Sequence, residues 1–306
     1  MVGYVYDPIF TQHGSDDHIE NRFRVETIHQ VAQNFPLRRY QAMRASKEDL
    51  IKIHEAHYVD WVERAYEEGY RFILNEDTLL TPKSFEVASY AAGSTMPIVD
   101  AFARGEIRRA FLNIRPPGHH AERRTGQGFC IFNNIALMAR YAQLRGFQKV
   151  AIIDFDVHHG NGTQDIFYDD DSVLFFSSHE RNNYPYFSGS EDERGVGKGE
   201  GFTINRPYGD YCSDEEILAI YDTLPKWFEP DIVLVSAGYD LMKDEFISTA
   251  QISFEGLRGI VRKILEYASN KPVAFVLEGG YNLESLARSV EITLEELVNF
   301  ATIEEK

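Results

Sequence analysis

Short apolar runs alternate with amphipathic helical patterns along most of the 306-residue chain. The runs are rich in β-branched and aromatic residues, as buried strands of a parallel sheet are; they span residues 2–6, 110–114, 150–155, 173–177, 232–237 and 273–277. Helical patterns lie between them and include residues 133–145, 213–228, 253–269 and 283–300. This order predicts an α/β fold in which helices cover both faces of a mostly parallel central sheet. No repeat, low-complexity tract or Pro/Ser-rich linker divides the chain, so we expect a single domain over residues 1–306.

Composition excludes several classes of partner. The formal net charge is −17, which argues against a nucleic-acid-binding surface and favours attraction of small cations. No apolar run approaches the ~20 residues of a membrane helix, so we expect no membrane partner. The first residues lack a basic stretch followed by a long apolar one, and Cys130 and Cys212 form no C-x-x-C pair. We therefore expect a cytoplasmic protein without disulfides.

Four polar clusters each follow a predicted strand. Ligands of such α/β sheets bind beyond the carboxyl ends of the strands, so clusters at several strand ends point to one shared site. The clusters are R-P-P-G-H-H at residues 115–120, D-F-D-V-H-H-G-N-G at 154–162, G-Y-D at 238–240 and E-G-G-Y-N at 278–282.

The second cluster suggests a metal site. Asp154, Asp156 and His158 alternate at a strand end, so their side chains point to one side. Burying two carboxylates with an imidazole is costly unless a cation or several donors compensate. With Asp240 from another strand, Asp156 and His158 would give three ligands and an open position, as in catalytic zinc sites. Asp154 is then better placed to orient His119. The alternative is an acidic strand end held by hydrogen bonds without a metal.

Two further groups suggest hydrolytic chemistry. His119 and His120 follow Pro116-Pro117-Gly118, and neighbouring imidazoles beside a metal can act as general base and acid. Tyr281 lies in a Gly-Gly-Tyr turn after a buried strand, where a phenol can donate to the oxyanion of a tetrahedral intermediate. Taken alone, a His-His pair is more often a surface feature and a single Tyr more often a packing residue.

The motifs together resemble those of the histone deacetylases, which have the arginase/deacetylase fold. They are R-P-P-G-H-H-A, G-F-C, D-F-D-V-H-H-G-N-G-T-Q, A-G-Y-D and L-E-G-G-Y-N, beginning at residues 115, 128, 154, 237 and 277. Asn161 in the third motif resembles the class II branch. The chain is also similar to bacterial acetylpolyamine amidohydrolases in residues 160–168, in P-Y-F-S-G at 185–189 with the glycine-spaced stretch 195–201, and in E-N-R-F-R at 20–24.

The resemblance implies a role for each matching residue. The implied zinc ligands are Asp156, His158 and Asp240, and the implied catalytic residues are His119, His120, Tyr281, Asp154 and Asn161, with His120 as general base. The implied substrate-binding residues are Phe129 and Phe187 as tunnel walls, Gly128, and Asp77 as the rim carboxylate. Arg24 is implied as a product-channel residue, and Asp154, Ser177 and Ser178 as ligands of a structural K⁺ or Na⁺.

These roles predict a zinc-dependent amidohydrolase that removes acetyl groups by metal-activated water and releases acetate. We expect no acyl-enzyme, because the chain has no nucleophile elbow or Cys-His signature. The resemblance to acetylpolyamine amidohydrolases implies acetylpolyamines as substrates. The net charge of −17 and the acidic runs at 191–193 and 244–245, predicted near the pocket mouth, favour the same substrates. An acetyl-lysine peptide substrate is the alternative.

The sequence departs from the family at several positions. Glu245-Phe246 stands where Asp-Pro is usual, and Ile247 stands where some eukaryotic polyamine deacetylases have a gatekeeping Glu. The insertion that builds the dimer and narrows the tunnel mouth in some acetylpolyamine enzymes is missing between Asp77 and Ser84. These departures bear on polyamine specificity, and they leave a homo-oligomer open.

Two other functions remain as alternatives. A ureohydrolase of the same fold needs two manganese ions, an Asp-x-His-x-Asp motif and a later Asp-x-Asp motif. This chain has Asp-x-Asp-x-His instead, and Leu241-Met242 follows Asp240. A catalytically silent module that binds acetylated ligands would be expected to lack a histidine of the pair or Tyr281, and all three are present.

Overall fold

The computed structural model describes residues 1–74 and 77–304, with side chains up to residue 300. Its main feature is one sheet in which every neighbouring pair of strands is parallel. The strands, in their order across the sheet, are β2 (Leu37–Tyr40), β1 (Val2–Val5), β5 (Arg109–Leu112), β10 (Val273–Leu277), β9 (Ile232–Ala237), β6 (Val150–Asp154), β7 (Val173–Glu180) and β8 (Thr203–Tyr208). All six strands predicted from the apolar runs are present.

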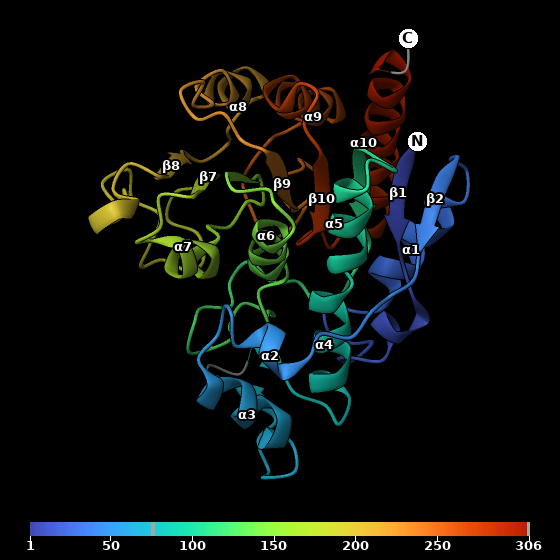
Figure 1. The fold of residues 1–306 in the computed structure, drawn as a ribbon, viewed down its shortest axis with the longest axis vertical. Helices are drawn as coiled ribbons and strands as arrows, with labels where there is room; N and C mark the ends of the chain where they lie inside the picture. Colours follow the sequence, from blue (N-terminus) through green and yellow to red (C-terminus); the bar gives the residue numbers. More distant parts are fainter. Residues whose placement is uncertain (75–76, 305–306) are drawn as a thin grey trace.

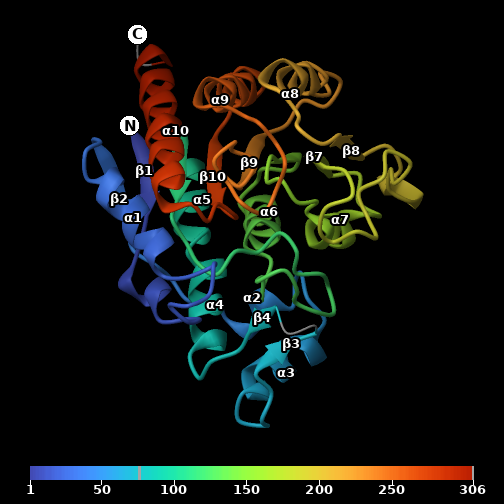
Figure 2. The ribbon, with the colours of Figure 1, turned by 180° about the vertical axis from the view of Figure 1, so that it is seen from behind.

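Helices cover both faces of this sheet, as the alternating pattern predicts. On one face α1 (Phe23–Ala32), α10 (Leu283–Glu304), α9 (Phe254–Ala268) and α8 (Asp214–Tyr221) contact one another in that order. On the other, α6 (Asn134–Leu144) contacts α4 (Ser84–Gly93), α5 (Met96–Ala103) and α7 (Asn161–Phe167). Figure 1 shows α5 and α6 in front of the sheet. Figure 2, the view from the opposite side, shows α10 in front.

The remaining elements are short. They are α2 (Lys47–Leu50), α3 (Ala56–Ala65), the antiparallel pair β3 (Phe72–Ile73) and β4 (Thr78–Leu79), and the 3₁₀ turns η1 (Pro8–Thr11) and η2 (Gly197–Gly199). Figure 2 shows α3 and the β3–β4 pair projecting from the end of the molecule opposite the C-terminus. Within the described residues, no helix combines the length and apolar character that a membrane span requires.

Local sequence explains where the elements begin and end. The central strands β6, β9 and β10 are buried at every position, which matches their continuous apolar runs. Ser213 and Glu216 form the predicted capping box that begins α8. The helix predicted over residues 213–228 is too long, because α8 ends at Tyr221. Pro225 accounts for this early end: within a helix, its ring would clash with the carbonyl of Tyr221.

Candidate active site

The four polar clusters meet because their strands are neighbours at the centre of the sheet. The strands β5, β10, β9 and β6 lie side by side, and each ends within three residues of the start of one cluster. Since these strands are parallel, their carboxyl ends open onto the same edge. A cavity of about 330 Å³ lies at this edge, and its walls include His119, His120, His158, Gly279 and Tyr281.

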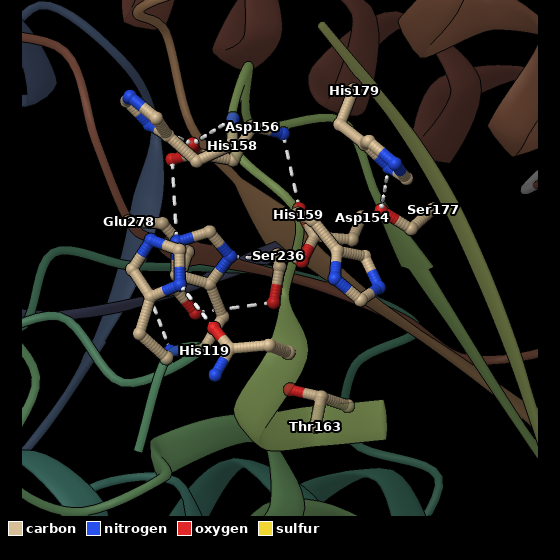
Figure 3. Close-up of polar contacts among 12 residues, drawn as sticks. His119, Asp154, Asp156, His158, His159, Thr163, Ser177, His179, Ser236 and Glu278 are labelled. Atoms are coloured by element: carbon tan, nitrogen blue, oxygen red, sulfur yellow. Dashed lines mark hydrogen bonds and ion pairs between the residues drawn. The ribbon is translucent and has the colours of Figure 1, made fainter. Parts of the chain in front are cut away.

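Three buried residues form a compact group of possible metal ligands, and one of them, His158, lines this cavity. Asp156, His158 and Asp240 each offer one ligand atom within 4.8 Å of the others. His158 Nδ1 lies 3.0 Å from Asp156 Oδ1 and 3.3 Å from Asp240 Oδ2. Figure 3 shows Asp156 and His158 beside each other, just beyond the end of β6. β6 ends at Asp154, so Asp156 and His158 lie in the bend after the strand rather than in the extended run that was predicted, and they still approach Asp240.

The electrostatics of this group fit a bound cation. Asp240 Oδ2 is buried and makes no hydrogen bond of acceptable geometry, although His158 Nδ1 lies 3.3 Å away, whereas Asp240 Oδ1 accepts the Val157 N–H at 3.0 Å. Burial alone would lower the pKa of His158, but the charges of Asp240 and Asp156 raise it to about 10. Two carboxylates and an imidazole with an unsatisfied oxygen can therefore hold a metal ion that neutralises them. Oxygen and nitrogen donors of this kind suit a divalent transition metal.

The two adjacent histidines have different partners. His119 Nδ1 lies 2.9 Å from Asp154 Oδ2, and Figure 3 shows this contact. His120 Nδ1 lies 2.7 Å from Asn161 Oδ1. Burial opposes charge on His119, but Asp154 and Asp156 raise its pKa well above 6.5. Burial lowers the pKa of His120 well below 6.5, and His119 adds to this effect. The His119 ring is therefore suited to donate a proton, and the His120 ring to accept one.

Glu278 supports this pair from behind, and the sequence assigned it no role. Its Oε2 accepts the backbone N–H groups of Gly118 at 2.8 Å and His119 at 3.1 Å. Its Oε1 accepts from the Ser236 hydroxyl at 3.1 Å. Burial raises the pKa of Glu278 to about 7. Its place in the L-E-G-G-Y-N motif, directly after a buried strand, was the only signal of its importance.

Tyr281 lies in the cavity wall with its ring edge-on to Phe129 at 6.0 Å. Burial, and next the charge of Asp240, raises the pKa of Tyr281 well above 10, so the phenol keeps its proton and can donate it. Arg24 lies behind the ring, with Cζ 4.9 Å from the ring centroid. The Arg24 guanidinium donates to the carbonyls of Gly280 and Glu278 and pairs with Glu20. Arg24 thus anchors the loop of Tyr281; its predicted role in product release stays a prediction.

Three of the four residues predicted to bind substrate line this cavity, and the fourth lies outside its walls. Phe129, Gly128 and Asp77 line the cavity. Gly128 has φ +54, and a Cβ there would lie 2.4 Å from His120 Cδ2, so glycine is required. Phe187 does not line this cavity; its side chain is 68% exposed beside a neighbouring cavity.

Tyr184 lines the wall in place of Phe187. Its ring is edge-on to His120, with the centroids 5.0 Å apart, and its hydroxyl donates to Gln127 Oε1 at 3.2 Å. The backbone turns at Tyr186 (φ 68) before it reaches Phe187, and that turn directs Phe187 outward. Tyr184 directly precedes the P-Y-F-S-G stretch at residues 185–189. The prediction therefore located the correct segment of the wall but chose the wrong aromatic residue in it.

The predicted monovalent-cation residues are brought together only in part. Asp154 pairs in register with Ser177 across β6 and β7. The Ser177 hydroxyl lies 2.9 Å from His179 Nδ1, a contact that Figure 3 shows. The Ser178 hydroxyl lies 2.8 Å from the Tyr221 hydroxyl, on the side of α8. A cation at this position stays a prediction.

The acidic runs 191–193 and 244–245, which were predicted near the pocket mouth, are not among the residues that line the cavity. Glu245 is only 8% exposed and accepts backbone N–H groups, while Glu191 pairs with Arg181 and Glu193 accepts the Gly189 N–H. Asp77 is the carboxylate among the cavity-lining residues. Backbone N–H groups therefore hold Glu245 and Glu193, and Arg181 holds Glu191.

Comparisons with known proteins agree with this site. The histone deacetylase domain model matches residues 18–297. A probable deacetylase of Archaeoglobus fulgidus is 35% identical over 93% of this chain and 82% of its own length. The human polyamine deacetylase HDAC10 is 37% identical over 85% of this chain, which spans 41% of that protein.

Solved structures give the same result for the fold. The HDA15 HD domain superposes with a TM-score of 0.91 and 31% identity, covering 97% of this chain and 88% of that one. An acetylpolyamine aminohydrolase from Burkholderia pseudomallei superposes with a TM-score of 0.90 and 25% identity, covering 97% of this chain and 98% of its own. The chain therefore belongs to the histone deacetylase domain family and is a deacetylase.

Proposed function

We propose that this chain hydrolyses N-acetylated amines at a zinc ion held by Asp156, His158 and Asp240. The single observation that carries the proposal is that His158 of this buried group lines one cavity together with the His119–His120 pair and Tyr281. One nitrogen and two oxygen donors beside an open cavity suit zinc in its catalytic form. Bound there, zinc would supply Lewis acidity toward the acetyl carbonyl and toward water.

The chain's own residues would divide the proton transfers between them. His120, which burial keeps neutral, accepts a proton from the attacking water through the nitrogen that faces away from Asn161. Tyr281 donates its phenolic hydrogen to the oxyanion as the carbonyl carbon becomes tetrahedral. His119, whose pKa Asp154 and Asp156 raise, returns a proton to the leaving amine. The products are acetate and the free amine.

The proposed substrates are small acetylated polyamines. The net charge of −17 favours a polycation, and Asp77 places a carboxylate in the cavity wall. The similarity to a polyamine deacetylase and to an acetylpolyamine aminohydrolase points the same way. Each exposed charge pair contributes only about 1 kcal/mol and is screened by salt. The preference should therefore be modest and salt-dependent.

The test is a substrate panel run at low and high salt. It compares kcat/KM for an N-acetylated spermidine with that for an acetyl-lysine peptide. We expect a preference of about fivefold or more for the polyamine at low salt, close to the ~1 kcal/mol of one charge pair, that shrinks at high salt. A preference for the peptide would instead assign the site to lysine deacetylation. A cytoplasmic location, the structural K⁺ or Na⁺ and a homo-oligomer remain predictions alongside this proposal.

A further inference from the structure

Glu122 lies outside the cavity walls, yet two amides that support the cavity converge on it. Asn161 Nδ2 donates to Glu122 Oε1 at 2.7 Å, and Gln127 Nε2 donates to the same oxygen at 2.9 Å. A carboxylate can only accept hydrogen bonds, so each amide must present its NH₂ group to Glu122. The carbonyl oxygen of each amide is then turned toward its other neighbour.

For Asn161 that neighbour is His120. Asn161 Oδ1 lies 2.7 Å from His120 Nδ1, and an amide oxygen can only accept. His120 Nδ1 must therefore carry the hydrogen. In the neutral imidazole, Nε2 is then left with the lone pair that a general base needs. With its amide reversed, Asn161 would present hydrogens to Nδ1 and favour the opposite, inactive tautomer.

For Gln127 the neighbour is Tyr184. Gln127 Oε1 accepts from the Tyr184 hydroxyl at 3.2 Å, and the Tyr184 ring packs edge-on against His120. The same Glu122 oxygen thus supports both the hydrogen-bond partner of His120 and the aromatic wall beside it. Truncation of Glu122 should affect His120 through both contacts.

The backbone of Glu122 is itself held in place. Its N–H donates to the Thr125 carbonyl at 2.9 Å. Its carbonyl lies 2.8 Å from His54 Nδ1, while His54 Nε2 accepts the Asn133 N–H at 3.0 Å. His54 Nδ1 must therefore be the donor to Glu122. These contacts hold the Glu122 backbone in place. A side chain that orients other groups needs such a fixed backbone.

We propose that Glu122 is a positioning residue that orients the Asn161 amide and so fixes His120 as the tautomer with its hydrogen on Nδ1. The inference rests on the proposed function, in which His120 is the general base. Glu122 itself touches neither the substrate nor the metal group. Its effect on the reaction passes through Asn161 and, at the wall, through Gln127 and Tyr184.

Two single variants at position 122 separate acceptor loss from loss of charge. Glu122→Met keeps the side-chain length but removes the accepting oxygen, so kcat should fall about tenfold, less than the ~10²–10⁴ that a general base contributes. Glu122→Gln keeps one accepting oxygen for both amides and should retain kcat within about threefold, since an oxygen rather than a charge orients them. Equal metal content and Tm establish that each variant is folded.

A second substitution tests the orientation itself. Asp at position 161 has no NH₂ group to misplace, so it accepts from His120 Nδ1 in either orientation. In wild type, Asn161→Asp should lower kcat, because the new carboxylate would face Glu122 at the 2.7 Å contact. In the Glu122→Met background the same change should raise kcat toward the wild-type value. Wild-type kcat in Glu122→Met, or no rise in the double variant, would overturn the inference.

The tautomer can also be read without turnover. The ¹⁵N chemical shifts of the His120 ring, assigned by their loss in His120→Gln, should report hydrogen on Nδ1 in wild type and a mixture of tautomers in Glu122→Met. An unchanged tautomer in Glu122→Met would reject the role of Glu122, whatever the activity. A wild-type protein without deacetylase activity would instead reject the proposed function, and the ring signals would still decide the role of Glu122.

Discussion

The carboxylate of Glu245 holds the main chain of Tyr281. Glu245 Oε1 accepts the Tyr281 N–H at 2.8 Å and the next N–H, of Asn282, at 2.9 Å. Glu245 stands where the family usually has Asp, so this chain bridges to the tyrosine loop with a longer side chain. The position of the phenol over the cavity therefore depends on a residue that follows the third predicted metal ligand, Asp240, in sequence.

Replacing Glu245 with Ala should lower kcat by roughly tenfold while leaving KM within about threefold. The reason is that Tyr281 acts on the oxyanion, so a displaced phenol loses stabilisation of the transition state more than of the substrate complex. Glu245→Gln keeps an accepting oxygen for both N–H groups and is the matched control. Steady-state kinetics of the two variants decide the point, and an equal loss in both would show that charge rather than anchoring matters.

Removing the phenolic oxygen of Tyr281 should lower kcat more than loosening the Tyr281 loop does. We expect Tyr281→Phe to lower kcat by about 10²–10³, or roughly 3–4 kcal/mol, with a smaller change in KM. His120→Ala should be at least as damaging while metal content stays at the wild-type level. Single-turnover rates and elemental analysis measure both effects. An unchanged kcat in Tyr281→Phe would reduce the tyrosine to a packing residue.

Gly279 lies so close to the metal group that a methyl group there should disturb it. A Cβ at Gly279 would lie 2.0 Å from Asp240 Oδ2, whereas a Cβ at Gly209 would meet nothing within 4 Å. Gly279→Ala should therefore weaken metal binding by about 10–100-fold, the usual cost of disturbing the support of a ligand. Gly209→Ala is the control and should bind as wild type does. Elemental analysis after dialysis against graded chelator measures both, with about one zinc per wild-type chain expected.

The central strands and the site between them could be predicted because the relevant signals are local in sequence. A strand buried on both faces needs a continuous apolar run, and the polar cluster after it is visible as the run ends. The edge strands β2 and β8 lack this signal. Leu37–Tyr40 contains two arginines and Thr203–Tyr208 alternates in burial, because an edge strand is only partly covered.

Supporting contacts were harder to foresee because they join residues far apart in sequence. Glu278 reaches Gly118 and His119 across 160 and 159 residues. Glu245 contacts the Tyr281 loop from a position 36 residues away. No spacing rule connects such positions, since the parallel sheet alone brings them together. The Phe187 prediction failed for a local reason, namely a turn at Tyr186 that motif matching does not register.

The stability of the metal-free protein should depend on pH through Glu278. Burial raises the pKa of Glu278 from 4.5 to about 7, so between these values the folded protein binds more protons than the unfolded chain. The free energy of unfolding should therefore fall as pH rises from about 4.5 to 7, by at most about 3 kcal/mol from this group.

Glu278→Gln removes this titration while keeping an acceptor for Gly118 and His119. The difference in free energy of unfolding, variant minus wild type, should thus increase as the pH rises through this range. Urea unfolding of both chelated proteins at pH 5 and pH 8 measures the difference. Parallel pH profiles would mean that Glu278 titrates alike in the folded and unfolded states.

Asp77 should set how far the enzyme prefers a polycation. Its Oδ1 accepts from the Thr78 hydroxyl at 2.8 Å, and Thr78 Oγ1 accepts the Phe129 N–H at 3.1 Å, so Asp77 both charges the cavity wall and supports an aromatic side chain in it. Asp77→Asn removes the charge but keeps the acceptor. It should lower kcat/KM for an acetylated polyamine about fivefold at low salt, close to the ~1 kcal/mol of one screened pair, and abolish most of the salt dependence.

A second variant separates the two roles of Asp77. Thr78→Val breaks the hydrogen bonds to Asp77 and Phe129 without changing the charge, so it should affect polyamine and peptide substrates alike and keep the salt dependence. Asp77→Asn should instead change the polyamine much more than an uncharged acetylated amine of similar length. If both substrates lose equally in Asp77→Asn, the carboxylate acts through Phe129, and the preference for a polycation must come from the −17 net charge of the whole chain rather than from the cavity wall.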